Sequence, residues 1–380
     1  MNKTGQRILI VCDSSRSLMD FRGKLIEQLV QHHKVYVFTP RITQQSVREK
    51  LALLKVGVYE NELDGSNVSV LSDIRYIIQL YKLIKKLRPD VFFPYTFKPV
   101  IYGTVLAKLC RVKKITPMLT GLGYNFTPNA KKGLLSNITR QLLKFSLMNN
   151  RRLRIIFQNK DDYQTLLLHN ILTTKHKVAI VNGSGVDLEH YEYAPPDIKN
   201  VSFLMISRLI NAKGIYEYYE AARNIHLQHP NIQFKLIGAY GKNVDTISNE
   251  LYSKIKSGKT ITYLGEVDDV RPHIKNASVV VLPSYYGEGI PRCLLESMAM
   301  GRAIITSDSV GCRETIESAL AANGFLVPAK NVPELVSKMK FYLSDSNAIC
   351  SNGVNGLAFA RKKFDVNLVN AEMLKIMQLN

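Results

Sequence analysis

Residues 282–301 read LPSYYGEGIPRCLLESMAMG, and this segment is the most informative part of the chain. The apolar, β-branched run that ends at Pro283 predicts a buried strand, and a glycine-rich loop follows it. Pro291 suits the first turn of a helix, and Gly301 suits the end of that helix. The order of strand, loop and helix places the backbone N–H groups of Gly289–Cys293 at a helix start, which is an environment that binds phosphate.

Two glutamates flank this predicted anion site. Glu288 precedes the helix, and Glu296 lies about two turns into it. A nucleotide sugar presents a sugar, a diphosphate and a ribose in the matching order, so one carboxylate is placed to bind sugar hydroxyls and the other ribose hydroxyls. Taken singly, Glu296 is better explained as a solvated helix residue, and Glu288 as a charge that the helix dipole stabilises near the helix start. The functional interpretation therefore depends on the whole segment.

A second loop carries two cations. The segment SRLINAKG, residues 207–214, comes after a predicted strand and before a predicted helix at Ile215–Gln228. Arg208 offers a planar fork of donors and Lys213 a compact charge, a combination that can clamp a diphosphate. Two solvent-exposed loop cations explain this segment equally well when it is taken alone. Together with the helix start, the loop completes a diphosphate site.

Apolar, β-branched runs alternate with helical stretches along all 380 residues. This alternation predicts an α/β protein with doubly wound parallel sheets. The pattern restarts near Val201, just after the Pro-Pro dipeptide at 195–196. We therefore expect a Rossmann-like N-terminal domain at 1–193, a Rossmann-like C-terminal domain at 194–360, and a last helix within 361–380 that packs back on the first domain. Two such domains create an interdomain cleft, and ligands of these sheets bind beyond the carboxyl ends of the strands.

Charge is distributed unevenly along the chain. Lys and Arg number 51 against 31 Asp and Glu, a net charge of +20. Residues 1–190 hold 30 basic and 13 acidic side chains, net +17, whereas residues 191–380 hold 21 and 18, net +3. The first half is therefore expected to face a polyanion, which would be a nucleic acid, an anionic membrane or an acidic acceptor.

Residues 131–154, KKGLLSNITRQLLKFSLMNNRRLR, form a basic amphipathic segment without an acidic residue. A helix of this kind binds readily to an anionic membrane. A helix that packs its apolar stripe on the core explains the same spacing. We expect membrane contact through four cations of this segment: Lys131, Lys132, Arg151 and Arg152.

Several motifs of other function classes do not occur in the sequence. There is no Asp-x-Asp, no G-x-x-x-x-G-K-[ST], no G-x-G-x-x-G after the first strand and no H-E-x-x-H. The five Cys are scattered without C-x-x-C spacing, which fits a reducing, cytosolic compartment. Apolar stretches fall short of the ~20 residues that a membrane span needs. We therefore expect no metal, no cofactor and no membrane-spanning segment.

The two ligand-binding segments together resemble a known enzyme family. The frame Pro-Ser…Glu-Gly-x-Pro…Glu-x-Met-Ala-x-Gly of residues 283–301 and the Ser-Arg-Leu…Lys-Gly of residues 207–214 are similar to those of retaining family-4 glycosyltransferases. The similarity covers most of the chain and is strongest from 201 to 328. It implies the GT-B fold, in which two Rossmann-like domains hold the active site between them.

The resemblance also implies roles for the site residues. Glu288 would contact the donor sugar, and Glu296 the ribose. Arg208 and Lys213 would bind the diphosphate and stabilise it as it leaves, which makes them catalytic together with Glu288. The remaining donor contacts are expected from the helix start: Gly289, Ile290, Pro291 and Arg292.

The first half is similar to bacterial enzymes that extend polyprenyl-diphosphate-linked oligosaccharides. The similar loops are FRG at 21–23, KPVIYG at 98–103, TGLGY at 120–124 and NGSGVD at 182–187. Some relatives carry a His in the region 95–98, which here reads YTFK, so we assign no catalytic His. The expected acceptor or sugar contacts are Arg22, Lys98, Thr120 and Gly121.

The implied activity is a retaining, metal-independent transfer of a hexose or N-acetylhexosamine to a polyprenyl-diphosphate-linked glycan of surface polysaccharide, such as O-antigen or capsule. UDP-GalNAc or UDP-Gal is the expected donor. The expected partners are the nucleotide sugar, the lipid-linked saccharide and an anionic membrane, with the enzyme peripheral on the inner face of the cytoplasmic membrane and no nucleic acid.

Two alternatives stay open at this point. A nucleotide-sugar epimerase or hydrolase of the same architecture would use the same diphosphate site, but it needs an acid or base pair near the anomeric carbon. A basic nucleic-acid-binding protein would explain the +17 half, but it would interleave aromatic and basic residues. Residues 131–154 contain one aromatic residue, Phe145.

Overall fold

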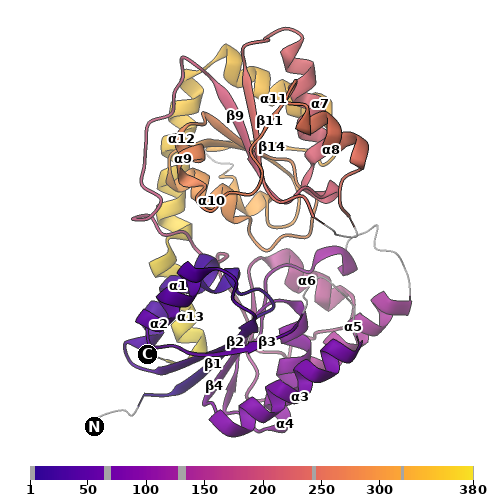
Figure 1. Ribbon diagram of the computed structural model, residues 1–380, viewed down its shortest axis with the longest axis vertical. Helices are drawn as coiled ribbons and strands as arrows, with labels where there is room; N and C mark the ends of the chain where they lie inside the picture. Colours follow the sequence, from indigo (N-terminus) through magenta and orange to yellow (C-terminus); the bar gives the residue numbers. More distant parts are fainter. Residues whose placement is uncertain (1–4, 64–69, 127–133, 242–244, 318–320, 380) are drawn as a thin grey trace. The chain divides into compact units, whose positions relative to one another are not determined.

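The computed structural model describes residues 5–63, 70–126, 134–241, 245–317 and 321–379. The chain forms two compact units, drawn in Figure 1. Unit 1 comprises Met1–Ser184 together with Asn367–Asn380, and unit 2 comprises Gly185–Val366.

Unit 1 is built on a parallel five-stranded sheet with the order β3-β2-β1-β4-β5. A smaller parallel sheet, β6-β7-β8, is linked to it by an isolated bridge between Tyr95 and Met118. Because β1 and β4 are neighbours, the chain winds outward in opposite directions from this pair. The strands are β1 (Arg7–Val11), β2 (Lys34–Pro40), β3 (Gly57–Asn61), β4 (Val91–Pro94), β5 (Lys114–Ile115), β6 (Met118–Leu119), β7 (Ile155–Phe157) and β8 (Val178–Ile180).

Alternate residues of β1 point to opposite faces of the sheet, and helices cover both faces. Ile8 and Ile10 are buried against α1, α2 and α13, whereas Leu9 and Val11 are buried against α3, α4 and α5 (Figure 1). The helices of unit 1 are α1 (Arg16–Val30), α2 (Gln45–Leu53), α3 (Val70–Leu87), α4 (Thr104–Leu109, after a π-helical turn at Pro99–Gly103), α5 (Leu134–Ser146), α6 (Lys160–Leu168) and α13 (Val366–Met377).

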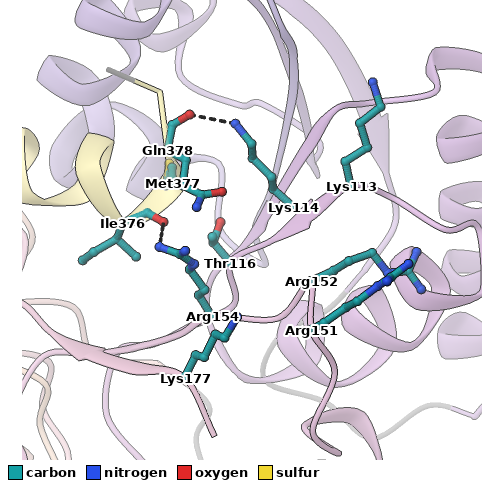
Figure 2. A pocket seen from close by; sticks show the side chains of 10 residues that line it. All are labelled: Lys113, Lys114, Thr116, Arg151, Arg152, Arg154, Lys177, Ile376, Met377 and Gln378. Atoms are coloured by element: carbon teal, nitrogen blue, oxygen red, sulfur yellow. Dashed lines mark hydrogen bonds between the residues drawn. The ribbon is translucent and has the colours of Figure 1, made fainter.

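The C-terminal helix α13 packs on the first face of the unit 1 sheet, with Met373 fully buried there. Two cations hold its last turn, as Figure 2 shows. Lys114 Nζ donates to the Gln378 carbonyl at 2.7 Å, and the Arg154 guanidinium donates to the Ile376 carbonyl at 3.5 Å. Positive charge at this position stabilises the negative end of the helix dipole.

Unit 2 is built on a parallel six-stranded sheet with the order β11-β10-β9-β12-β13-β14. Its winding direction reverses between β9 and β12, which pair with each other. The strands are β9 (Ser202–Ile206), β10 (Gln233–Ile237), β11 (Thr262–Tyr263), β12 (Val279–Leu282), β13 (Ala303–Ser307) and β14 (Gly324–Val327). The helices are α7 (Ile215–His226), α8 (Asn249–Lys256), α9 (Arg271–Lys275), α10 (Arg292–Ala299), α11 (Val332–Ser344) and α12 (Asn347–Phe359).

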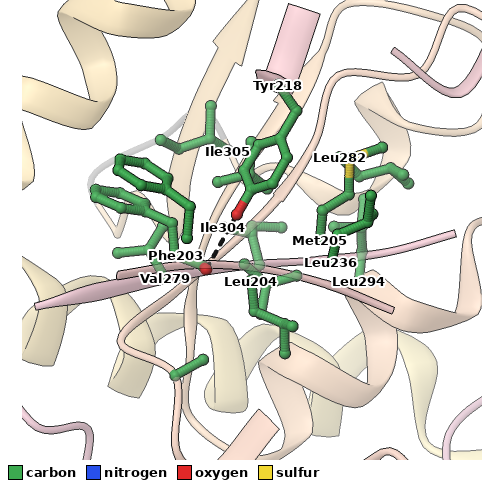
Figure 3. Close-up of a cluster of buried hydrophobic side chains, with 14 of the residues drawn as sticks. Phe203, Leu204, Met205, Tyr218, Leu236, Val279, Leu282, Leu294, Ile304 and Ile305 are labelled. Carbon is green, nitrogen blue, oxygen red and sulfur yellow. Dashed lines mark hydrogen bonds between the residues drawn. The ribbon is translucent and has the colours of Figure 1, made fainter. Parts of the chain in front are cut away.

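One apolar core fills unit 2 and fixes the strands whose loops carry the candidate site (Figure 3). Leu204 of β9 and Leu294 of α10 are fully buried in it. Tyr218 brings a polar group into this cluster, and its hydroxyl donates to the Phe203 carbonyl at 3.0 Å. A buried hydroxyl with a partner avoids the desolvation cost of an unpaired one.

Some sequence-based boundaries differ from the structure. The units divide between Ser184 and Gly185, whereas the sequence suggests a boundary after residue 193. The Pro-Pro segment belongs to unit 2, where the Ala194 N–H donates to the Met300 carbonyl at 3.3 Å. Among the described residues, no helix is long and apolar enough to cross a membrane.

Side-chain hydrogen bonds mark the ends of two helices. The segment 131–154 forms a helix only as far as Ser146, whose hydroxyl donates back to the Leu143 carbonyl at 2.8 Å. Helix α8 starts at Asn249, because the Ser248 hydroxyl caps it by accepting from the Leu251 N–H at 3.2 Å. Local side-chain bonds of this kind set helix ends where hydrophobic periodicity does not.

Candidate donor-binding site

The two predicted ligand-binding loops follow neighbouring strands. Residues 207–214 come after β9, and residues 283–291 come after β12. Both loops lie at the carboxyl edge of the unit 2 sheet, at the point where its winding reverses, which is where open α/β sheets bind ligands. Gly214 has φ +79°, and a side chain there would clash with the Pro283 carbonyl oxygen. The close approach of the two loops therefore requires this glycine.

Helix α10 begins at the end of the second loop, as the sequence predicts. Pro291 is its N-cap and makes no side-chain hydrogen bond there. The Leu294 N–H donates to the Pro291 carbonyl at 3.2 Å and so opens the helical ladder. Gly311, at φ +77°, packs so closely on Gly289 that a side chain would clash with the Gly289 carbonyl oxygen. The helix start is thus fixed in place as an environment that favours an anion.

Lys213 and Glu288 form an ion pair across these loops. Lys213 Nζ donates to Glu288 Oε1, and the Ser284 hydroxyl donates to the same oxygen at 3.2 Å. Burial by itself would lower the pKa of Lys213, but the adjacent Glu288 carboxylate raises it above its ordinary value. Lys213 therefore stays protonated beside Glu288.

Arg208 is exposed at the same edge, and its charge acts on Lys213. The structure thus brings together the two cations, the catalytic candidate Glu288 and the helix start that the sequence nominates. A group with several negative oxygens can bind Arg208 as a fork and Lys213 as a point charge. A diphosphate has this chemistry.

Glu296 lies one turn into α10 with an exposed fraction of 8%. Arg292 Nε donates to Glu296 Oε1 at 2.8 Å, and the Tyr191 hydroxyl donates to the same oxygen at 3.0 Å. Burial, and after it the Glu296 carboxylate, raises the pKa of Tyr191, so this hydroxyl stays a donor. The network fixes Oε1 of Glu296 through two donors, Arg292 and Tyr191.

The acceptor candidates all belong to unit 1, in different settings. Arg22 is 2% exposed on α1, and its guanidinium lies 5.3 Å from the Tyr95 ring centroid. Lys98 Nζ lies 3.0 Å from Asp73 Oδ1. Thr120 and Gly121 follow β6, and Gly121 has φ +116°. Lys98 and Thr120 therefore lie near the carboxyl ends of unit 1 strands, whereas Arg22 lies inside the unit.

The structure describes two of the four residues that are predicted to contact the membrane. Lys131 and Lys132 lie outside the described residues. Arg151 and Arg152 follow α5 in unit 1 and line a pocket with other cations.

Sequence reasoning misses three residues at these edges. Ser284 and Tyr191 bind the two glutamates, and Tyr191 is 105 positions away from Glu296, so no local pattern marks it. Asp13 is the second residue after β1, and burial raises the pKa of its carboxyl group. Its neighbour Thr96 has φ +71°, which a β-branched residue rarely adopts. An acid just after the first strand is a signal that could have drawn attention to Asp13.

Two family models match the chain. The model described as glycosyl transferase 4-like matches residues 7–159, and the model described as glycosyl transferases group 1 matches residues 200–345. The chain belongs to the group 1, family-4-like glycosyltransferases. This result decides for a transferase over an epimerase or hydrolase that uses the same diphosphate site.

The names of two relatives of the glycosyltransferase state an enzymatic activity. The chain is 26% identical over 385 residues to the N,N'-diacetylbacillosaminyl-diphospho-undecaprenol alpha-1,3-N-acetylgalactosaminyltransferase of Campylobacter jejuni, covering 97% of this chain and 98% of the relative. It is 25% identical over 288 residues to the UDP-Gal:alpha-D-GlcNAc-diphosphoundecaprenol alpha-1,3-galactosyltransferase of Escherichia coli, covering 72% and 71%.

Solved structures confirm the predicted fold class. HepE of Anabaena, crystallised with UDP and glucose, superposes on 98% of this chain and 99% of its own with a TM-score of 0.77 and 16% identity. The glycosyltransferase therefore has the GT-B fold, with a parallel α/β sheet in each unit.

Proposed function

We propose that this glycosyltransferase moves a hexose or N-acetylhexosamine from a UDP-sugar to a saccharide linked to a polyprenyl diphosphate, with retention and without a metal ion. The observation that carries the proposal is the Lys213–Glu288 ion pair beside Arg208 at the start of α10. The two relatives support the acceptor class, because the name of each specifies a sugar linked to undecaprenol through a diphosphate. They also favour UDP-GalNAc or UDP-Gal, since one transfers N-acetylgalactosamine and the other galactose.

The reaction needs positive charge where the diphosphate departs. The bond between the anomeric carbon and the diphosphate oxygen breaks, the acceptor oxygen bonds to that carbon, and the acceptor proton passes to the departing diphosphate oxygen. Arg208, Lys213 and the start of α10 hold fixed positive potential at this place. When the donor binds, its diphosphate replaces Glu288 as the partner of Lys213. Glu288 then accepts hydrogen bonds from sugar hydroxyls. Glu296 accepts from the ribose.

A lipid-linked acceptor is reached at a membrane, and α5 has a surface suited to one. This helix buries Leu143 completely, whereas Ile138, Leu142 and Phe145 are 46%, 40% and 58% exposed. Their spacing of four and three residues places the exposed side chains on one face. The core contact of Leu143 therefore does not account for the whole apolar stripe, and the remaining face is free to enter a lipid surface.

Helix α3 has a second stripe of the same kind. Leu71, Ile74, Ile78 and Tyr81 are all more than 40% exposed, again at spacings of three and four residues. Both α3 and α5 pack on α4, on the same side of the unit 1 sheet. The last turns of α3 also carry three exposed lysines: Lys82, Lys85 and Lys86. An apolar face beside cations favours attachment to an anionic membrane, here the inner face of the cytoplasmic membrane.

A thermal-shift screen of nucleotide sugars tests the donor assignment. A bound ligand stabilises the folded state by RT ln(1+[L]/Kd), about 2.7 kcal/mol at one hundred times Kd. We expect UDP-GalNAc or UDP-Gal to raise Tm most and the R208A/K213A protein to lose this rise. A screen in which GDP-sugars raise Tm as much, or in which the double variant keeps the full rise, contradicts the proposal.

Chelation tests the metal-free chemistry. Because Arg208 and Lys213 supply the positive charge, we expect turnover to persist in excess EDTA at the rate without chelator. Loss of turnover in EDTA that Mn²⁺ or Mg²⁺ restores would refute this part of the proposal.

A further inference from the structure

A basic pocket of about 270 Å³ lies in unit 1, whereas the donor-binding loops belong to unit 2 (Figure 2). Among the described residues that line it, none is acidic and none is aromatic. Six cations line it: Lys113, Lys114, Arg151, Arg152, Arg154 and Lys177. We refer to these six residues as the basic pocket.

The basic pocket lies at the amino ends of unit 1 strands. Lys114 is the first residue of β5, Arg154 directly precedes β7, and Lys177 directly precedes β8. Thr120, the acceptor candidate after β6, lies at the opposite, carboxyl end of its strand. Since ligands of doubly wound sheets usually bind at carboxyl ends, this pocket is a different site from the one the acceptor would use.

Part of the basic pocket has a structural role. Lys114 and Arg154 hold the last turn of α13, as described above, and Lys113 Nζ lies 2.9 Å from Asp90 Oδ1. Docking of α13 therefore explains two of the six cations. Arg151 and Arg152 stand on the other side of the pocket from α13 in Figure 2, so helix docking does not explain them.

The cations of the basic pocket repel one another. Burial lowers the pKa of Lys114, Asp90 opposes this, and Arg154 and Lys113 lower the pKa further. An anion bound between these side chains would attract each of them and would accept several charge-assisted hydrogen bonds.

We propose that the basic pocket binds a phosphate group, either of a soluble diphosphate or of an anionic lipid headgroup. Its volume is just below the ~300–1,000 Å³ of ordinary small-molecule pockets, and those are mostly apolar. No aromatic side chain lines it to stack on a base or a sugar. The site therefore suits the phosphate itself rather than a nucleotide. It adds a second phosphate site to the one in the proposed function, in the other unit.

Equilibrium dialysis of radiolabelled inorganic pyrophosphate tests the site. The full-length R208A/K213A protein serves as background, so that the donor loops do not contribute. Adding R151S/K177S, which leaves the cations that hold α13 in place, should weaken pyrophosphate binding at least tenfold. The charge-preserving R151K/K177R pair should retain it. The K256S/K259S pair removes the same charge from exposed lysines of unit 2 and should leave binding within twofold.

The proposal is overturned if R151S/K177S binds pyrophosphate as tightly as the background protein, or if K256S/K259S loses binding equally. Sedimentation with vesicles then identifies the source of the phosphate. Vesicles of phosphatidylcholine alone are compared with vesicles that also contain phosphatidylglycerol. If R151S/K177S weakens binding to the anionic vesicles and pyrophosphate competes, the phosphate is that of a lipid headgroup. If vesicle binding is unchanged, the ligand is a soluble diphosphate. The nucleotide-sugar screen is independent, so either proposal can fail alone.

Discussion

The candidate site of unit 2 and one buried acid of unit 1 hold their charge in opposite ways. In unit 2 the candidate carboxylates have cationic partners, since Glu288 pairs with Lys213 and Glu296 pairs with Arg292 at 2.7 Å. In unit 1 the carboxyl group of Asp162 is 3% exposed, and burial raises its pKa to about 7. The cations of unit 1 gather elsewhere, in the basic pocket and along α3.

This contrast indicates two kinds of recognition. A paired site such as that of unit 2 balances its charge within the protein, and under the proposed function it exchanges these partners for those of a nucleotide sugar. A surface with unbalanced positive charge attracts phosphate-rich partners over a larger area and without such exchange. The charge of the chain follows the same division, with +17 in residues 1–190 and +3 in residues 191–380.

The largest effect should come from removing the unbalanced charge. Replacing four cations with Ser should release the protein from anionic vesicles, because each Lys or Arg at an anionic surface contributes about 1 kcal/mol. At low salt this corresponds to a loss of affinity of about 10²-fold to 10³-fold, and the difference should shrink as salt rises. The measurement is sedimentation with phosphatidylglycerol vesicles. The replaced residues are Lys131, Lys132, Arg151 and Arg152.

A matched control removes four exposed cations from unit 2. It should sediment like wild type, because these lysines lie in the unit with little excess charge. Turnover on a short, water-soluble acceptor should be spared in both proteins. If the first variant sediments as well as wild type, the amphipathic segment is a core element and the comparison between the units fails. The control residues are Lys199, Lys256, Lys259 and Lys275.

The next largest effect should come from breaking the paired site. Arg208→Ala and Lys213→Ala should each lower turnover by about 10²-fold or more, because positive charge is lost where the diphosphate departs. Arg208→Lys should also be impaired if the guanidinium binds as a fork. Steady-state kinetics with a UDP-sugar measure this, and Arg223→Ala on α7 is a control. Near-normal turnover of both alanine variants would show that the pair is structural.

The residues that the sequence proposes for the donor site lie close together in the structure, because the signal for them is local. Arg208 and Lys213 lie in one loop, Glu288 and Glu296 in one segment, and both loops follow buried strands whose apolar runs are easy to recognise. The doubly wound order of the sheet then brings the loops together. Family resemblance and local pattern agree here, and the predicted GT-B fold is confirmed.

The features that the sequence does not predict depend on contacts between residues far apart in the chain. Tyr191 reaches Glu296 across 105 positions, and the end of α13 meets Lys114 across 264 positions. The basic pocket combines residues of three strand starts, so periodicity within any one segment cannot reveal it. Amphipathic spacing also does not predict which apolar residues of a helix are buried and which are exposed. In α5, Leu143 is buried and Phe145 is exposed.

The smallest expected effect concerns Asp162, a buried acid of unit 1, and it tests whether the carboxyl group of Asp162 lacks a cationic partner. Asp162 lies in the first turn of α6, where Asn159 Nδ2 donates to its Oδ2 at 3.1 Å and the nearby Asp161 charge adds to the effect of burial. Asp162→Asn keeps an oxygen at that position and removes the charge. The variant should gain stability relative to wild type as the pH rises from 5 to 8, measured as the free energy of unfolding at each pH.

The direction follows from proton linkage. The pKa of Asp162 is raised from 3.8 to about 7 in the folded protein, so between these values the unfolded chain has released a proton that the folded chain retains. The stability of wild type therefore falls with rising pH until about pH 7 and is level above it. The full shift corresponds to at most about 4 kcal/mol. Over pH 5 to 8 we expect the difference between variant and wild type to widen by about 1 kcal/mol or more. A constant difference would mean that Asp162 is ionised when folded, and that its charge is compensated as those of Glu288 and Glu296 are.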